Sequence, residues 1–91
     1  MYEITYTNKF KADWKRCERR GLPMERIMEA INTLAMDGVL PPKYKTHKLS
    51  GKFAGCMECH IMPDWLMVWK QDEKKLTLLL TDTGSHSDLF G

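Results

Sequence analysis

The chain has 91 residues, of which 43% are hydrophobic and nine are aromatic. This apolar content is enough for one core but not for two, so we expect a single domain over residues 1–91. The formal net charge is only +2, which by itself does not argue for a nucleic-acid partner. No apolar run is long enough to cross a membrane, and residues 1–6 do not resemble a signal peptide. We therefore expect a cytoplasmic protein whose three cysteines are reduced.

The charge is unevenly distributed along the chain. Residues 1–52 carry eleven lysines and arginines against six acidic residues, whereas residues 53–91 carry three against six. A basic first half predicts a positive face that could meet phosphate groups. The competing interpretation is that these charges solvate helix surfaces.

The first half of the chain reads as a strand followed by two helices. Alternating apolar residues predict a short strand over residues 2–6. Helical spacing of apolar residues predicts one helix over residues 9–20, with Asn8 as its N-cap, and a second over residues 23–37. Glycines at the ends of both segments favour two antiparallel helices joined by a tight turn.

The second half reads as a loop and three strands. Residues 39–52 contain a Pro-Pro pair and four lysines, which predicts a basic loop. Strand-like runs follow over residues 53–61, 65–69 and 76–80, and residues 84–91 form a short tail. The predicted order is β-α-α-β-β-β. This indicates an α+β domain with two antiparallel helices packed on a twisted antiparallel sheet.

The three histidines of the chain each lie in a short, distinctive segment. His47 lies in the lysine-rich loop, His60 comes shortly before a Pro-Asp turn, and His86 follows the last long strand. Imidazole is the side chain whose acid and base forms are both accessible near neutral pH. The alternative is that they are ordinary loop residues.

Two metal-dependent interpretations compete with acid–base chemistry. Cys56, Cys59 and His60 match the C-x-x-C-H pattern of covalent haem attachment. In a strand, however, residues three apart point to opposite faces, so the two thiols could not reach one haem edge. A zinc site would need a second close ligand pair, which is missing, although three histidines could form a transient site. We therefore expect no metal and no cofactor.

Metal-free acid–base catalysis remains as the third interpretation. Asp64 follows the proline turn after His60, and neighbouring antiparallel strands could bring His86 to the same sheet edge. His47 could fold over that edge from the loop. Such a cluster, surrounded by lysines, suits attack of a ribose 2′-OH on the adjacent phosphodiester, with a second group protonating the leaving 5′-oxygen.

These segments resemble the YafQ-type toxins of the RelE/ParE superfamily, which are bacterial toxins of type II toxin–antitoxin systems. The resemblance extends over the whole chain and is most specific in residues 40–51, 58–70 and 84–91. It implies a RelE-like fold, ribosome-dependent endoribonuclease (mRNA interferase) activity and binding to mRNA. It also implies a cognate antitoxin, with the chain monomeric when free and hetero-oligomeric with that partner.

The resemblance also implies roles for individual residues. Four residues stand where the family keeps its acid–base groups: His47, His60, Asp64 and His86. We expect His86 to be the general acid, and His60, His47 or Asp64 to be the base. Phe90 stands where an aromatic lies close to the substrate, and Glu58 and Trp65 have supporting positions. The loop lysines at positions 45, 48 and 52 (Lys45, Lys48 and Lys52) would contact RNA phosphates.

Two departures from the family raise a competing hypothesis. The family usually has arginine at the positions of Met57 and Asp82, where arginine could stabilise a scissile phosphate or belong to a structural network. If those arginines act in the site, stabilisation of the phosphate must come from the loop lysines, Lys43 included, or be lost. The chain would then be a catalytically weakened module retained for binding an antitoxin or the ribosome. A thiol or haem redox protein is a third hypothesis.

Overall fold

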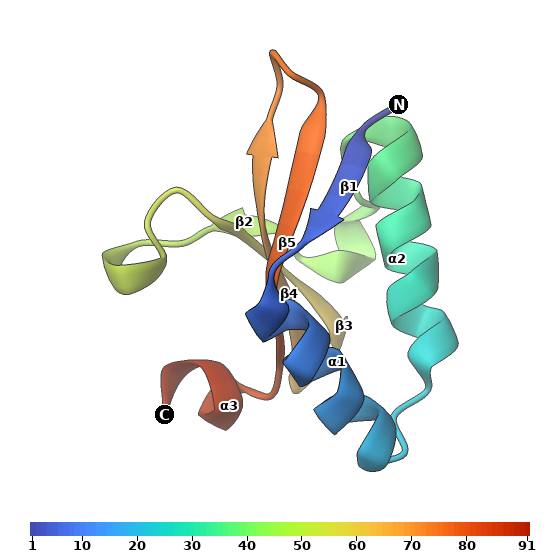
Figure 1. Cartoon of the computed structure of the whole chain (residues 1–91), viewed down its shortest axis with the longest axis vertical. Coiled ribbons are helices and arrows are strands. Elements are labelled where there is room, and N and C mark those ends of the chain that lie inside the picture. Colours follow the sequence, from blue (N-terminus) through green and yellow to red (C-terminus); the bar gives the residue numbers. More distant parts are fainter.

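One five-stranded mixed sheet organises the molecule, with strands in the order β1-β5-β4-β3-β2 (Figure 1). The computed structural model describes residues 1–91. Both long helices lie on one side of this sheet, and a short third helix follows β5 (Figure 1). The strands are β1 (Glu3–Tyr6), β2 (His47–Lys48), β3 (Met57–Met62), β4 (Trp65–Asp72) and β5 (Thr77–Gly84). The helices are α1 (Asn8–Arg19), α2 (Met24–Asp37) and α3 (His86–Phe90), with 3₁₀ turns η1 (Pro42–Tyr44) and η2 (Gly51–Phe53).

The predicted α+β class and the two-helix, one-sheet arrangement are confirmed, but the sheet is not purely antiparallel. Strands β2 to β5 pair antiparallel, whereas β1 lies parallel to β5, with Glu3 opposite Thr77 and Tyr6 opposite Leu80. The chain leaves β1 into the two helices, and this long crossover permits a parallel return. Alternation of side chains predicts a strand but carries no information about the direction of its partner.

Each long helix begins and ends where local chemistry favours it. Thr7, rather than Asn8, caps α1: its side-chain oxygen accepts a hydrogen bond from the backbone N–H of Phe10 at 3.0 Å. Gly38 ends α2 in the left-handed conformation at φ 74°. A Cβ at Gly38 would lie 2.6 Å from the ring of Tyr2, so this close approach also requires glycine.

Two apolar clusters lie on opposite faces of the sheet. The larger one is formed by 15 buried residues of the helices and the helix-facing side of the sheet, with Trp65, Trp69 and Phe10 among its largest side chains. The smaller one contains Cys56, Leu66, Val68 and Leu89 and lies under α3. Because α3 covers the second face, its buried Leu89 holds the C-terminal segment against the sheet.

The basic loop and the tail are more ordered than the sequence predicted. Residues 47–48 form the edge strand β2, which pairs with residues 57–58 of β3. Phe53 belongs to η2, so β3 begins later than expected. The tail forms α3, whose N-cap Ser85 and third residue Asp88 make a reciprocal capping box.

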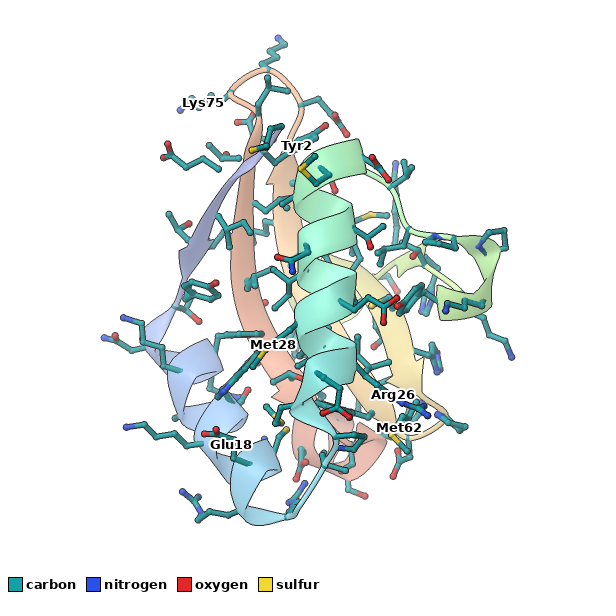
Figure 2. All side chains as sticks on the ribbon, turned by 90° about the vertical axis from the view of Figure 1, so that its right-hand side faces the viewer. Tyr2, Glu18, Arg26, Met28, Met62 and Lys75 are labelled. Carbon is teal, nitrogen blue, oxygen red and sulfur yellow. The ribbon has the colours of Figure 1, made fainter.

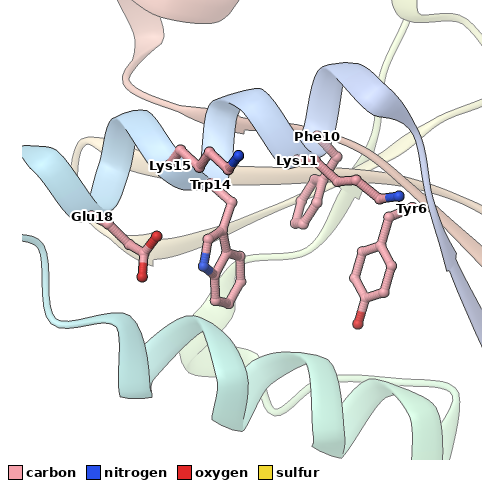
Figure 3. Close-up of a pocket in the computed structure, with 6 residues that line it drawn as sticks. All are labelled: Tyr6, Phe10, Lys11, Trp14, Lys15 and Glu18. Carbon is pink, nitrogen blue, oxygen red and sulfur yellow. The ribbon is translucent and has the colours of Figure 1, made fainter.

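Helices α1 and α2 diverge from the turn that joins them (Figure 1), and a surface cleft of about 410 Å³ lies along α1. Tyr6, Phe10 and Trp14 provide its aromatic wall, with Lys11, Lys15 and Glu18 at its rim (Figure 3). None of the helices is long and apolar enough to cross a lipid bilayer.

Candidate active site

The three histidine rings form a continuous row. The ring centroids of His47 and His60 are 6.2 Å apart, and those of His60 and His86 are 5.8 Å apart. Strand β2 supplies the first ring, β3 the second and the first turn of α3 the third. Segments that are distant in sequence meet here because β4 and β5 return the chain to the same end of the sheet.

His47 is held between two hydrogen-bond acceptors. Its Nε2 lies 3.0 Å from Oε1 of Glu58, and its Nδ1 lies 3.0 Å from the backbone carbonyl of Lys45. A neutral imidazole has one N–H and can donate to only one of these oxygens, whereas the imidazolium donates to both. The two acceptors hold the His47 ring in a fixed orientation.

Glu58 is the buried acid of the site. It is 3% exposed, and its second carboxylate oxygen, Oε2, has no hydrogen-bond partner. A buried carboxylate is stable only when it is paired or hydrogen-bonded. The adjacent His47 supplies that pairing at Oε1. This side-chain contact joins the edge strand β2 to β3 in addition to the two backbone residue pairs between them.

His60 is the central ring of the row and the least constrained. It is half-buried on β3 and points to the same sheet face as Glu58, two residues earlier. None of its ring nitrogens lies within hydrogen-bonding distance of a protein group, in contrast to those of His47 and His86. A ring nitrogen of His60 is therefore free to accept a proton from a bound molecule.

His86 and Asp64 form a direct pair across the end of the sheet. Oδ1 of Asp64 lies 2.5 Å from Nδ1 of His86 and also accepts the backbone N–H of His86 at 3.0 Å. Both hydrogen bonds lower the pKa of Asp64, and the one from the backbone N–H of His86 contributes the most. The carboxylate thus fixes Nδ1 as the protonated nitrogen and leaves Nε2 of His86 directed away from the pair.

The C-terminal end of α1 holds α3 in place through ion pairs. Nη1 of Arg20, the C-cap of α1, lies 2.5 Å from Asp88, and Nη2 of Arg16 lies 3.7 Å from the same carboxylate. The hydrogen bond from Arg20, together with the capping contacts of Ser85, holds the pKa of Asp88 well below its usual range. Because His86 opens α3, this anchoring positions the histidine as well.

Two aromatic rings extend the row beyond His86. Phe90 is 49% exposed, and its ring centroid lies 6.5 Å from that of His86. The ring of Phe53 packs against Phe90 edge-to-face at 5.5 Å, and Nζ of Lys52 lies 5.2 Å from the Phe53 centroid. Phe53 was missed from the sequence because it was placed at the start of a strand. Its position after Lys52, in a turn bounded by glycines, was the feature that could have indicated a surface aromatic.

The three loop lysines fall into two groups. Lys45 is adjacent to the row, since its carbonyl contacts His47, and Lys52 lies beside the Phe53–Phe90 pair. Lys48 follows His47 in β2 and points to the other sheet face, where it lines a separate pocket with Gln71 and other residues. The structure therefore separates Lys48 from the histidines.

The two positions that depart from the family pattern are engaged within the protein. Met57 packs against the larger apolar cluster. Asp82 is 8% exposed, and its carboxylate lies 3.2 Å from Nζ of Lys9 on α1. Lys9 also contacts Asp13, which is 2% exposed and accepts the backbone N–H of Thr83 at 3.2 Å. In this chain position 82 belongs to an ion-pair network between α1 and β5.

The remaining singled-out residues have structural roles. The indole N–H of Trp65 donates to Oγ1 of Thr83 at 2.9 Å, which joins β4 to the end of β5 just before Gly84. Cys56 and Cys59 lie in different apolar clusters on opposite sheet faces, as the strand geometry predicted. Burial raises the pKa of the Cys59 thiol to about 12, so it is not a reactive thiolate.

The row could also hold a metal ion. One ligand atom each from His47, Glu58 and His60 lie within 4.8 Å of one another. Two imidazoles and a carboxylate form a donor set that Zn²⁺ favours. The sequence pattern did not indicate this set, because it grouped His60 with Cys59. It did not reveal that Glu58, two positions earlier, and His47, on the neighbouring strand, lie close to His60.

Comparisons with known proteins agree with this geometry. Residues 2–91 match the family described as "Bacterial toxin of type II toxin-antitoxin system, YafQ". The chain belongs to the YafQ toxin family. It is 31% identical to the mRNA interferase toxin YafQ of Escherichia coli K12 over 90 residues, which cover 98% of this chain and 96% of the relative. This confirms the predicted membership and, at that level, the endoribonuclease toxin class.

Solved YafQ-family structures share the fold. The E. coli DinJ–YafQ complex contains a chain that aligns with TM-score 0.90 and 29% identity, covering 100% of both chains. YafQ from E. coli strain BL21(DE3) aligns with TM-score 0.92 and 28% identity, again over 100% of both. A metal-bound toxin from Helicobacter pylori aligns with TM-score 0.89 and 37% identity over 99% of this chain and 100% of the other.

Proposed function

We propose that this YafQ-family toxin is a ribosome-dependent endoribonuclease that cleaves mRNA by metal-free acid–base catalysis. The observation that carries the proposal is the row of three imidazoles in three different hydrogen-bonding states, with Asp64 fixed to one end. Groups in different states can take different roles in one reaction, which is what cleavage through a 2′-OH requires.

His86 is assigned as the general acid. With Nδ1–H donating to Asp64, the carboxylate stabilises the imidazolium form, and the proton on Nε2 is the one free to leave. That proton would pass to the 5′-oxygen as its bond to phosphorus breaks. The leaving RNA fragment then carries a 5′-OH.

His60 is assigned as the general base. Its ring nitrogens have no protein partner, so one can take the proton of the ribose 2′-OH while the 2′-oxygen attacks phosphorus. The upstream fragment ends in a 2′,3′-cyclic phosphate. His47 is less suited to this role because both its nitrogens face acceptors. Asp64 is less suited because its lowered pKa makes it a weaker base.

The charged and aromatic surroundings support an RNA substrate. The His47 imidazolium would stabilise charge on the phosphoryl oxygens, and the half-exposed Phe90 would stack on a nucleotide beside the cut. Lys45 and Lys52 flank the row and would contact backbone phosphates. On α1, Arg19 carries no ion pair and remains available to ribosomal RNA.

The decisive experiment maps mRNA ends on translating ribosomes by primer extension. Wild-type protein should generate new 5′-OH ends, and His86→Ala should reduce their rate of formation by about a hundredfold to ten-thousandfold, as expected for loss of a general acid. His60→Ala should have a similar effect. Lys75→Ala, in the distant β4–β5 turn, is the matched control. Cleavage that is unchanged in both histidine variants contradicts the assignment.

The competing hypothesis is a catalytically weakened binding module. It rests on the absence of arginine at positions 57 and 82, where Met57 packs against the larger apolar cluster and Asp82 pairs with Lys9. A folded chain that arrests growth without cutting mRNA, and whose arrest survives His86→Ala, would support it.

We also propose that the partner of this chain is an antitoxin that docks an acidic, amphipathic segment along α1. The aromatic wall of the α1 cleft offers apolar contact area, and Lys11 and Lys15 at its rim complement acidic side chains (Figure 3). The double variant Lys11→Glu/Lys15→Glu should weaken antitoxin binding at least tenfold while mRNA cleavage is retained. Retained affinity together with lost ribosome association would assign this surface to RNA instead.

A further inference from the structure

The row of histidines has little permanent positive charge of its own to bind RNA. Position 57 is occupied by a core-facing methionine, and Asp82 is neutralised by Lys9. Three basic residues of α1 and its C-cap are likewise engaged with carboxylates. Phosphate contacts supply most of the affinity for a nucleic acid, so a cation beside the row that no carboxylate engages is a candidate contact for a neighbouring phosphodiester.

A polar cleft of about 350 Å³ opens at His60. Helix α2 contributes Arg26 and Glu29, η1 contributes Lys43 and Tyr44, and β3 contributes His60 and Ile61. The cleft exists because β2 pairs only with residues 57–58, so the edge of β3 beyond Glu58 carries no further strand. Figure 2 shows Arg26 projecting at the end of α2 beside Met62, the last residue of β3.

Neither cation of this cleft is paired with a carboxylate of the protein. Neither Arg26 nor Lys43 has a carboxylate oxygen within 4.0 Å, and both side chains are exposed. Nζ of Lys43 lies 5.3 Å from the ring centroid of Tyr44, which is 7% exposed and forms a fixed wall. Unlike the paired basic residues of α1, these two keep their charge available to a ligand.

Glu29 limits the charge that the cleft accepts. It lies three residues after Arg26, on the same side of α2, and also lines the cleft. Two cations and one carboxylate leave a net charge of about +1 at neutral pH. A single phosphodiester carries one negative charge, so the balance matches one backbone phosphate rather than a nucleotide triphosphate or a dense polyanion.

We propose that Arg26 and Lys43 form a subsite for the RNA phosphodiester next to the scissile one, with His60 shared between this subsite and the reacting bond. This inference rests on the proposed function. Arginine offers paired donors to two phosphate oxygens, and Lys43 adds a mobile point charge from the opposite wall. The subsite thus adds positive charge beside the row from α2 and η1.

The test measures binding of an RNA oligonucleotide that cannot be cut because the attacking 2′-hydroxyl is replaced by hydrogen. Fluorescence anisotropy over a salt series gives the dissociation constant and its salt slope for the wild type, Arg26→Ala and Lys43→Ala. Each variant should bind about tenfold more weakly, as expected for a charged hydrogen bond of about 1.5 kcal/mol. Each should also lower the salt slope by about 0.7, the value for one phosphate contact on single-stranded RNA.

The control is Lys75→Ala, which removes the same charge at the far end of the molecule (Figure 2). Arg26→Lys should recover part of the affinity, which a purely structural role would not predict. Thermal unfolding should be unchanged, because both cations are exposed. In the cleavage assay the alanine variants should raise KM and leave kcat largely intact.

Salt slopes in Arg26→Ala and Lys43→Ala that equal that of Lys75→Ala would overturn the subsite, as would absence of any binding by the wild type. The proposed function fails separately, when the wild-type protein produces no mRNA ends or His86→Ala cuts as well as wild type. Because the binding assay uses RNA that cannot be cut, the two failures are distinguishable.

Discussion

Two sets of charged residues differ in how completely they are paired: one joins α1 to β5, and the other lies along β2, β3 and the start of α3. On the α1 side, Asp13 receives hydrogen bonds from Lys9 and from the backbone of Thr83, and Arg16 lies 3.2 Å away. On the histidine side, Glu58 keeps an unpartnered oxygen and His60 has no partner at all. The carboxylates of the first set are buried and paired with cations, and the second set is open to a ligand.

This difference teaches which charges serve the fold and which serve chemistry. A buried carboxylate paired with cations resists change because its removal leaves those cations uncompensated. Changing a cluster whose polar groups lack protein partners costs little stability. Those unpartnered groups, however, are the ones that can hydrogen-bond to a substrate. The following predictions, in order of decreasing effect, test that contrast.

The largest effect should come from breaking the ion-pair network between α1 and β5. Asp13→Ala leaves Lys9, Arg16 and the Thr83 N–H without their common acceptor, and should lower the free energy of unfolding by about 3 kcal/mol or more. Urea denaturation followed by circular dichroism measures this loss. Asp37→Ala, at the exposed end of α2, should change stability by less than about 0.5 kcal/mol. Equal stabilities for the two variants would refute the contrast.

The second largest effect should appear in activity rather than in stability. Asp64→Asn replaces the carboxylate that faces His86 Nδ1, so the ring loses both its orientation and the stabilisation of its protonated form. Cleavage on ribosomes should fall about a hundredfold, equivalent to about 2.7 kcal/mol of transition-state stabilisation. The melting temperature should move little because both side chains are more than half exposed. A variant that melts early but cuts normally would reverse the assignment.

A third prediction uses the unpartnered oxygen of Glu58. Zn²⁺ bound by His47, Glu58 and His60 would occupy the ring nitrogen that we assign as the base. At a free zinc concentration about ten times its dissociation constant, cleavage should fall about tenfold and recover when EDTA is added. Glu58→Gln should weaken zinc binding in a calorimetric titration. Zinc that binds without inhibiting would show that His60 is not the base.

The smallest effect concerns pH and the anchor of α3. Asp88 has a lowered pKa in the folded protein, so its stabilisation is fully present above about pH 4, the ordinary pKa of an aspartate, and fades as the pH falls below it. Asp88→Asn should therefore cost about 1 kcal/mol at pH 7 and progressively less as the pH falls below about 4. A stability difference that grows on acidification would contradict this sign.

Much of the fold could be predicted because its signals are local. Helical spacing in α1 and α2, the left-handed stop at Gly38 and the apolar run of β4 all depend on neighbours in sequence. The parallel pairing of β1 with β5 could not, since it is set by how the helices cross the sheet. Helix α3 was missed although Ser85 and Asp88 have the spacing of a capping box, because five residues are too short for apolar periodicity to register.

The candidate site was predictable in its residues but not in its connections. The prediction that Asp64 would lie beside the histidines identified the right neighbourhood, yet its partner is His86 and not the nearby His60. The pairing of His47 with Glu58 depends on a two-residue strand that the basic loop conceals. The family resemblance placed residues in the site, whereas only three-dimensional contacts distinguish their hydrogen-bonding states.

Gly84 has a consequence for how this toxin can be lost by mutation. A Cβ at this position would lie 2.7 Å from the carboxylate of Asp88 and 3.0 Å from Arg16, so any side chain must displace α3. Every missense change of a glycine codon introduces a Cβ. A cell under pressure to survive the toxin could therefore silence it at this codon and still make the sheet and both long helices, and with them the aromatic cleft along α1.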